Sequence, residues 1–285
     1  MLIHSRTRRL CALFLALSIL FLAGCGAKKP PAEPEPPFAG LEVTVFSAGK
    51  ADAILLTTPA SAVLIDCGEK GFGDEILDEL AARGVEKLDL LIVTHFDRDH
   101  VGGAARVIGG VSIERVLQSN SPRQSGEYRR YLRALEKASL TPETVRETLS
   151  ISLDGAQYTV SPPLRERYDQ SASNNSSLIV TLVYGETSLL FMGDAETARI
   201  AEFLDSSPAA CDLIKLPHHG EKEKLLDALL AAVRPRYAVI TCSEREPEAA
   251  STAKALADAA VAAYLTRLGA VRIRSDGEIL TVEYR

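Results

Sequence analysis

The sequence predicts a mixed α/β fold in which two β-sheets lie face to face with helices on both outer sides. From Leu41 onward, short strands come first and alternating strands and helices follow, and this order occurs twice. Each sheet must bury an apolar face, and two stacked sheets covered by outer helices meet that requirement. Because no change in composition divides residues 41–285, we expect them to form one domain with a large core.

The first half of this region is rich in short strands separated by turn residues. Apolar residues at helical spacing predict a helix over Asp74–Arg83, closed by Gly84. A short helical pattern covers Ala104–Ile108, and a polar loop with an Arg-rich helix is expected over Ser119–Ala138. The expected strands are Leu41–Ser47, Ala53–Thr57, Ser61–Asp66, Leu88–Val93 and Ile113–Gln118.

The second half begins with strands and then alternates between helix and strand. The first strands expected there are Val145–Ile151, Tyr158–Ser161, Ser177–Tyr184 and Ser188–Met192. The expected helices are Ala195–Leu204, Lys222–Val233 and Glu248–Ala259. The remaining strands are Cys211–Leu216, Tyr237–Cys242, Ala262–Leu265, Val271–Arg274 and Ile279–Tyr284. Asp276-Gly277, between the last two strands, predicts a hairpin.

The first 25 residues have the features of a bacterial lipoprotein signal. Three arginines precede an apolar run over Leu10–Ala23 that is short for a membrane span, and Leu22-Ala23-Gly24-Cys25 resembles a lipobox. We expect residues 1–24 to be removed and Cys25 to carry lipid, which places the protein outside the cytoplasm, anchored to a bacterial membrane. An ordinary secretory signal and an uncleaved anchor are the alternatives. Residues 25–40 then form a Pro-rich linker, and no later apolar run is long enough to span a bilayer.

The charge balance argues against general electrostatic capture of nucleic acid. The chain has a formal charge of −6, and loss of residues 1–24 with their three arginines lowers it to −9. Such capture requires a basic surface that displaces counterions. A local basic groove formed by Arg123, Arg129, Arg130 and Arg133 stays open, although a solvated helix face is the simpler interpretation.

Three cysteines follow Cys25, and their spacing fits neither a disulfide framework nor a zinc ribbon. Cys67, Cys211 and Cys242 lie mostly within apolar runs, so we expect their side chains to be buried. One disulfide between two of them stays open in an oxidising compartment.

Four potential metal ligands lie within six residues, directly after the strand expected at Leu88–Val93. They are His95, Asp97, Asp99 and His100, and a Gly pair follows them. Imidazole nitrogens and carboxylate oxygens both bind divalent ions, and a strand-to-helix turn can direct such side chains to one point. The alternative is a charged surface loop with two chance histidines. Against it, all four histidines beyond the signal segment fall in two tight clusters, each after an apolar strand.

Polar residues also end three other apolar runs. Asp66 closes one, Asp194 follows another, and His218-His219 follows a third. An Asp after Gly often forms a turn or caps a helix, and Asp194 alone has that simple explanation. Together with the first cluster, these residues supply enough ligands for a pair of divalent ions.

The polar residues at the strand ends form one combined pattern: His95-x-Asp97-x-Asp99-His100-x-Gly102-Gly103, with Asp66, Gly193-Asp194 and His218-His219-Gly220. This pattern resembles the metallo-β-lactamase superfamily, and in particular the domain of that fold in ComEC-type competence DNA-uptake proteins. In that branch an Asp stands where most of the superfamily has a second His, as Asp97 does here, and Ser173–Leu178 resembles the branch as well. The resemblance covers residues 41–284 and implies a four-layer αββα sandwich.

The resemblance also implies two divalent ions, Zn or Mn, and a role for each residue. One ion would be held by His95 and Asp97, the other by Asp99, His100 and His219, with Asp194 bridging the two. Asp66 would orient a ligand from behind, and Asn174 or Asn175 stands where many relatives supply a third His. His218 would be a ligand or would contact the transition state. The candidate catalytic residues are therefore Asp99 and His218.

A pair of ions with this ligand set predicts a hydrolase. Two ions about 3.5–4 Å apart lower the pKa of a shared water and clamp the oxygens of an in-line displacement, which suits a phosphodiester. Asp97 in place of His makes the first site harder and shifts its preference from Zn toward Mn. We predict a phosphodiester-containing substrate, with nucleic acid as one candidate, and no obligate protein partner. The alternatives are hydrolysis of an ester, lactone or β-lactam by the same fold, and a non-enzymatic accessory lipoprotein.

Overall fold

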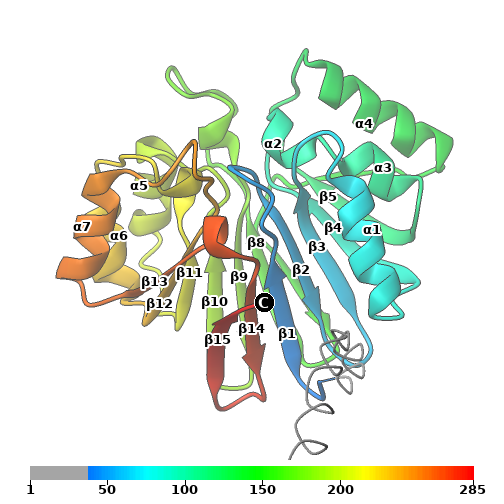
Figure 1. Cartoon of the computed structure of the whole chain (residues 1–285). Coiled ribbons are helices and arrows are strands. Elements are labelled where there is room, and N and C mark those ends of the chain that lie inside the picture. Colours follow the sequence, from blue (N-terminus) through cyan, green and yellow to red (C-terminus); the bar gives the residue numbers. More distant parts are fainter. Residues whose placement is uncertain (1–37) are drawn as a thin grey trace, which may run out of the picture. The chain divides into compact units, whose positions relative to one another are not determined.

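Residues 38–285 are described by the computed structural model, and they belong to one compact unit. Two β-sheets lie face to face, with α1 to α4 against one outer face and α5 to α7 against the other (Figure 1). The predicted four-layer αββα sandwich is therefore confirmed. The predicted signal peptide, the lipidated Cys25 and the linker up to residue 37 lie outside the described residues. Within residues 38–285, no helix is long and apolar enough to span a membrane.

The first sheet has eight strands in the order β15-β14-β1-β2-β3-β4-β5-β6. Strands β3 to β6 run parallel to one another, whereas the other neighbours are antiparallel. Four helices belong to this half, namely α1 (Gly73–Ala82), α2 (Arg98–Val101), α3 (Ala104–Ile108) and α4 (Gly126–Lys137). The strands are β1 (Leu41–Val45), β2 (Ala53–Thr57), β3 (Ala62–Cys67), β4 (Lys87–Val93), β5 (Ser112–Gln118), β6 (Glu143–Thr144), β14 (Val271–Ser275) and β15 (Leu280–Tyr284).

The second sheet has seven strands in the order β13-β12-β11-β10-β9-β8-β7. Strands β10 to β13 are parallel, and β7 to β10 are antiparallel. Its helices are α5 (Thr197–Asp205), α6 (Leu226–Val233) and α7 (Ala250–Asp258), and single 3₁₀ turns occur at η1 (Asn174–Ser176), η2 (Pro217–Gly220) and η3 (Thr266–Leu268). The strands are β7 (Leu149–Leu153), β8 (Ala156–Ser161), β9 (Ile179–Tyr184), β10 (Thr187–Phe191), β11 (Leu213–Lys215), β12 (Tyr237–Ile240) and β13 (Ala262–Leu265).

Three apolar layers hold the sandwich together: one between the sheets and one beneath each group of helices. Strand β9 shows how period-two alternation supplies two layers at once. Val180 and Leu182 point into the layer between the sheets, whereas Ile179 packs in the layer beneath α5 to α7. Because central strands are apolar on both faces, they appear in the sequence as nearly continuous apolar runs.

Most expected elements are present, with two informative differences. The strand expected at Val145–Ile151 is divided between the sheets, since β6 pairs with β5 and β7 pairs with β8. The helix expected from Lys222 begins only at Leu226. The hairpin at Asp276-Gly277 is confirmed by the antiparallel pairing of β14 with β15. The three cysteines among the described residues are buried and unpaired.

The packing of β9 predicts how two substitutions on this strand change the free energy of unfolding. Leu182 is fully buried between the sheets, whereas its neighbour Val183 is 39% exposed. Leu182→Ala should lower the free energy of unfolding by about 2–5 kcal/mol through lost burial and a residual cavity. Val183→Ala, the matched control on the same strand, should cost less than about 1 kcal/mol. Urea unfolding followed by circular dichroism measures both changes, and equal losses would contradict this description of the core.

Candidate metal centre

The polar residues singled out in the sequence meet at one edge of the sandwich, at the end where α2 lies (Figure 1). Asp66 is the penultimate residue of β3, and residues 94–100, here called the ligand loop, follow β4 and carry His95 and His100. Asp194 and His219 follow β10 and β11 of the other sheet. Parallel strands end at the same edge of a sheet, and in this fold the polar side chains that follow the strands of both sheets lie at the same edge of the sandwich.

Four side chains form a compact group of potential ligands: Asp99, His100, Asp194 and His219. The Nε2 atom of His219 lies 3.2 Å from Asp194 Oδ2 and 3.4 Å from Asp99 Oδ2. The Nε2 atom of His100 lies 3.2 Å from Asp194 Oδ1. Ligands about 2.0–2.1 Å from a tetrahedral ion stand roughly 3.3–3.4 Å from one another. The spacing of this group therefore fits one divalent ion.

His95 and Asp97 lie beside this group, and His95 also approaches Asp194. The Nε2 atom of His95 is 3.8 Å from Asp97 Oδ2 and 3.9 Å from Asp194 Oδ2. The rings of His95 and His100 are 4.1 Å apart between centroids. Asp194 is thus within reach of both sets of side chains, which is the place required of a bridging carboxylate.

Unpartnered buried atoms mark the same place. Among the described residues, five buried side-chain nitrogen or oxygen atoms have no hydrogen-bond partner. Four of them belong to this cluster: the Nε2 atoms of His95, His100 and His219, and Oδ1 of Asp194. Leaving such a group buried without a partner costs about 1–3 kcal/mol. Divalent ions would satisfy all four atoms, so the residues present fit a metal centre.

On His100 and His219, the other ring nitrogen, Nδ1, forms a hydrogen bond with a side-chain oxygen behind the ring. His100 Nδ1 donates to Asp66 Oδ2 over 2.8 Å, and His219 Nδ1 lies 2.9 Å from Thr241 Oγ1. The Thr241 hydroxyl donates to Asp52 Oδ1, so its oxygen accepts from His219. These bonds orient the two rings so that Nε2, rather than Nδ1, faces the space where an ion would bind.

His95 follows the same rule through Thr94. The Thr94 hydroxyl donates to Asp66 Oδ2 over 2.5 Å, and its oxygen lies 3.2 Å from His95 Nδ1. Asp66 also accepts the backbone N–H of Thr94 over 2.8 Å. Its backbone has φ 58°, a left-handed conformation that Asp tolerates better than most residues. Asp66 therefore supports two histidines from behind, in the position predicted for it.

Sequence reasoning missed Asp52 and Lys215, which complete the buried charge distribution. Lys215 on β11 is fully buried, forms an ion pair with Asp52, and lies 3.9 Å from Asp194 Oδ1. Its Nζ also donates to the carbonyl of Gly193. A lysine within the apolar run Leu213–Leu216 was a readable signal, because an unpaired buried charge is very costly. Asp52, which precedes β2, carried no such signal.

The cluster shifts the pKa of its own carboxyl groups. Burial would raise the pKa of Asp194, but the nearby His100 and His219 outweigh it and hold that pKa well below its usual range. Burial opposes ionisation of Asp99 too, and the neighbouring His219 and His100 outweigh it and lower the pKa of that carboxyl group. Both carboxylates therefore remain ionised at neutral pH, as metal ligands must be.

His218 lies outside the buried group. Both His218 and His219 have left-handed backbone conformations, with φ 46° and 53°, and this turn directs His219 inward while His218 stays 28% exposed. The Nε2 atom of His218 is 3.3 Å from Asn174 Nδ2, and its Nδ1 is 3.6 Å from Glu196 Oε1. A place at the rim suits contact with a substrate better than metal binding.

The two asparagines differ from each other in their contacts. Asn174 donates to Glu196 and faces His218, so it supports the rim. Asn175 binds elsewhere: its amide oxygen accepts from the N–H of Arg199, and its nitrogen donates to the carbonyl of Gln170. The Asn175 amide therefore anchors the loop to α5.

Two further observations concern Asp97 and Asp194. Ser173, the first residue of the Ser173–Leu178 stretch, donates to Asp97 Oδ1 over 2.7 Å, and Arg123 Nη2 lies 3.0 Å from the same oxygen. The alternative role of Asp194 as a helix cap is wrong, because α5 begins at Thr197 with Glu196 before it.

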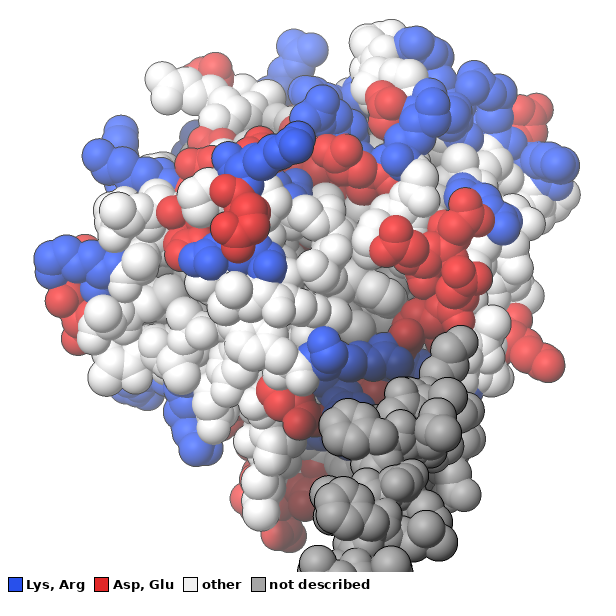
Figure 2. Space-filling model, in the orientation of Figure 1, with Lys and Arg blue, Asp and Glu red and all other residues white. Residues whose placement is uncertain are grey.

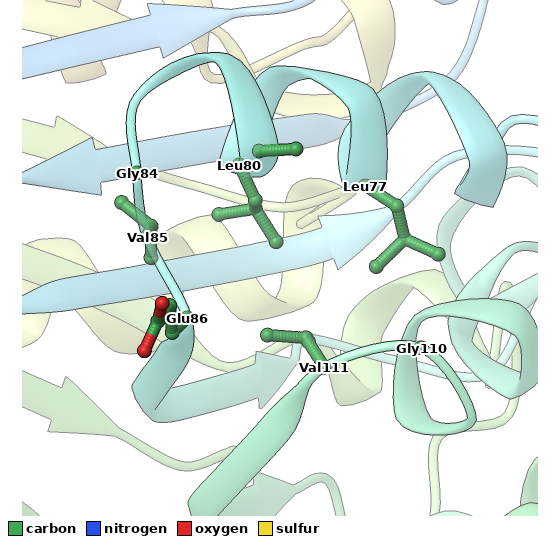
Figure 3. Close-up of a pocket in the computed structure, with 8 residues that line it drawn as sticks. Leu77, Leu80, Gly84, Val85, Glu86, Gly110 and Val111 are labelled. Carbon is green, nitrogen blue, oxygen red and sulfur yellow. The ribbon is translucent and has the colours of Figure 1, made fainter.

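A separate apolar groove is remote from this centre. It has a volume of about 350 Å³ and lies between the end of α1 and the segment after α3 (Figure 3). Val85 and Glu86 in its wall precede β4, whereas His95 follows the other end of that strand. The groove therefore contributes nothing to the cluster.

Comparison with known proteins supports the motif-based resemblance. Residues 47–243 match the model of the metallo-β-lactamase superfamily. The chain is 27% identical over 222 residues to ComE operon protein 3 of Bacillus subtilis (strain 168), a match that covers 71% of this chain and 28% of that protein. It is 28% identical over 230 residues to competence protein ComA of Neisseria gonorrhoeae, covering 78% and 29% respectively. The predicted resemblance is thereby confirmed.

The matched relatives are much longer, and the chain spans less than a third of their length. Among solved structures, the metallo-β-lactamase fold protein YhfI from Bacillus subtilis superimposes with a TM-score of 0.55. That match covers 86% of this chain and all of YhfI at 10% sequence identity. At that identity the likeness concerns the fold alone.

The hydrogen bond between Thr241 and His219 Nδ1 predicts that loss of the Thr241 hydroxyl lowers the affinity for metal. Thr241→Val keeps the shape of the side chain but removes the acceptor for His219 Nδ1 and the donor to Asp52. Metal affinity should fall about 10–100-fold, because partners behind a ligand fix its orientation. Chelator competition measures the affinity. Thr187→Val, which removes a buried hydroxyl bonded to the Tyr184 carbonyl at the start of β10, at the opposite end of that strand from Asp194, is the control. Equal affinities of the two variants would refute the role of Thr241.

Metal binding should weaken as the pH falls. Burial opposes a charge on His100 and His219, but Asp194 and the neighbouring carboxyl groups outweigh it and raise the pKa of both rings. The metal-free rings therefore keep protons to a higher pH than free histidine, and an ion must displace them from Nε2. Each displaced proton lowers affinity about tenfold per pH unit on the acidic side of that pKa. Calorimetry in buffers of different ionisation enthalpy counts the protons, and binding without proton release would contradict this.

Proposed function

The chain belongs to the metallo-β-lactamase superfamily, and on that premise we propose that it is a metal-dependent phosphodiesterase, with DNA as a candidate substrate. The observation that carries the proposal is the group of four unpartnered buried atoms on His95, His100, His219 and Asp194. Such atoms are costly without ions, and their spacing suits divalent ones. The similarity to competence proteins supports the nucleic-acid candidate.

The ligand set divides around Asp194. His95 and Asp97 would hold one ion, and Asp99, His100 and His219 would hold the other, with Asp194 between them. When bound, two such ions would supply a water of lowered pKa and positive charge for the phosphoryl oxygens. Zn and Mn are the candidate ions, because the ligand set contains both imidazole nitrogens and carboxylate oxygens. The Asp97 carboxylate is a harder ligand than imidazole and favours Mn at its site.

The chain's own residues would bind and orient the substrate at the rim. Arg123 is 42% exposed beside Asp97, and a guanidinium can bind two phosphate oxygens at once. His218 lies at the same rim with its ring held near Asn174 and Glu196. The ionised Asp99 is partly exposed as well, which places it next to an incoming substrate.

The location and partners of the protein form part of the same proposal. A lipid on Cys25 and a Pro-rich linker over residues 25–40 would hold the enzyme on the outer side of a bacterial membrane. The substrate would be a phosphodiester-containing molecule that reaches that surface. We propose no obligate protein partner.

A substrate panel separates this proposal from its rivals. With Zn or Mn, we expect hydrolysis of bis-nitrophenyl phosphate and single-stranded DNA, and about two metal equivalents by elemental analysis. Preferential hydrolysis of a nitrophenyl ester or of nitrocefin would favour carboxyl chemistry in the same fold. Absence of both bound metal and turnover would favour a non-enzymatic lipoprotein and end the proposal.

Removal of one ligand from either ion should abolish turnover while the fold remains. We expect Asp97→Ala or His100→Ala to lower kcat by roughly a hundredfold or more, because each variant loses a ligand to one of two cooperating ions. Initial rates on bis-nitrophenyl phosphate and circular dichroism test both statements. Asp205→Ala, an exposed aspartate at the end of α5, is the control. Full activity of either ligand variant, or of metal-stripped protein, would refute the proposal.

A further inference from the structure

A strongly basic segment lies beside the candidate centre of this acidic protein. Residues 119–138 contain five Lys or Arg and two Glu, whereas the whole chain has a formal charge of −6. The segment comprises α4 and the loop before it. In Figure 2, Lys and Arg gather at the upper right, over the region of α4 in Figure 1.

Aromatic packing attaches α4 to the ligand loop. Phe96, between His95 and Asp97 in the sequence, packs against Tyr128 and Tyr131 of α4 at centroid distances of 4.6 and 5.9 Å. Tyr131 is fully buried, and its hydroxyl donates to Gln118 at the end of β5. The helix therefore has a fixed position relative to the metal ligands, and so do the arginines on its outer face.

Arg123 joins the basic segment to the centre itself. Its Nη2 atom lies 3.0 Å from Asp97 Oδ1, and the side chain is 42% exposed. An ion bound by Asp97 would take up part of that carboxylate's charge, which would make the guanidinium available to an anionic ligand. Arg123 therefore places a positive charge beside the candidate ligands, and further arginines follow on α4.

Arg129 and Arg133 extend the positive charge along the helix. They are one helical turn apart and exposed, so they lie on the same face of α4. Arg129 donates to the backbone carbonyl of Gln124, and within the described residues neither arginine forms an ion pair with a carboxylate. Arg130 differs, since it is paired with Glu127. We define the α4 ridge as Arg123, Arg129 and Arg133.

We propose that the α4 ridge binds the sugar-phosphate backbone of a single nucleic-acid strand that continues into the metal centre. This inference rests on the proposed phosphodiesterase function. An anionic membrane surface would also attract arginines, but Arg123 contacts a candidate metal ligand, and only a polymer with successive phosphates uses the ridge and the centre together. Arg129 and Arg133 lie about 6 Å apart along the helix axis, and a stacked strand advances about 3.4 Å per nucleotide, so these two arginines span about two phosphates. With Arg123 at the centre, the ridge would contact about three phosphates.

Binding without cleavage gives the first test. Fluorescence anisotropy of a labelled single-stranded oligothymidine, with the full chain in excess EDTA, compares wild type with the double variant Arg129→Glu/Arg133→Glu. We expect dissociation constants about tenfold higher for the variant, and a salt slope smaller by about 1.4, from about 0.7 for each lost phosphate contact.

The control variant is Arg234→Glu/Lys254→Glu, which makes the same change in net charge at exposed positions on the α6 and α7 side. Circular dichroism melting verifies that both variants fold. Selective loss in the ridge variant supports the proposal. Equal affinity of all three proteins, or equal loss in both variants, overturns it.

A length series gives the second test. For the metal-loaded wild type, KM should fall from a dinucleotide to an oligonucleotide of about five residues and then level off, because the ridge reaches about three phosphates. The ridge variant should lose this dependence on length. Retention of the full dependence by the variant contradicts the proposal.

Two further comparisons distinguish failure of the proposed binding surface from failure of the proposed function. Sedimentation with phosphatidylglycerol vesicles tests the membrane alternative, and a ridge variant that loses vesicle binding but keeps oligonucleotide binding overturns the nucleic-acid surface. If the wild type fails to hydrolyse any diester yet binds strands through the ridge, the proposed function fails and the binding surface stands. If it hydrolyses bis-nitrophenyl phosphate but binds strands independently of the ridge, only the surface fails.

Discussion

The candidate centre depends on the hydrogen bonds and the buried lysine behind its ligands. Asp66 and Thr241 hold the Nδ1 atoms of His100 and His219, so each ring presents a free Nε2 to the same space. Several buried carboxylates would repel one another there, and Lys215 provides the compensating charge between Asp52 and Asp194. A buried charge that loses its partner is strongly destabilising, so these groups must form together when the sheets pack.

The two sheets make that assembly possible because the parallel strands in each of them end at one shared edge. Strands β3 and β4 bring polar residues from the first sheet, and β10, β11 and β12 bring them from the second. The apolar layer between the sheets holds these ends at fixed separation. It also maintains the left-handed backbone at Asp66, His218 and His219, which would otherwise be unfavourable.

The same packing links the centre to its surroundings. Phe96 follows His95 in the sequence but packs against α4, so the loop that carries the ligands also fixes a basic helix beside them. Asn174 and Ser173 from a distant loop contact His218 and Asp97 at the rim. The residues at the rim and the candidate metal ligands are therefore positioned by one set of core interactions.

The sequence alone determined the fold class, most strands and helices, and the side chains that converge, because apolar periodicity and His/Asp clusters at strand ends are local signals. His95, His100, Asp194 and His219 were identified in this way. Tertiary structure decided what depends on distant partners: the division of the strand expected at Val145–Ile151 between two sheets, and the hydrogen bond that joins Asn175 to Arg199 of α5. It also decided the pairing of Asp52 with Lys215, since these residues are far apart in the sequence and only the packed sheets bring their opposite charges into contact.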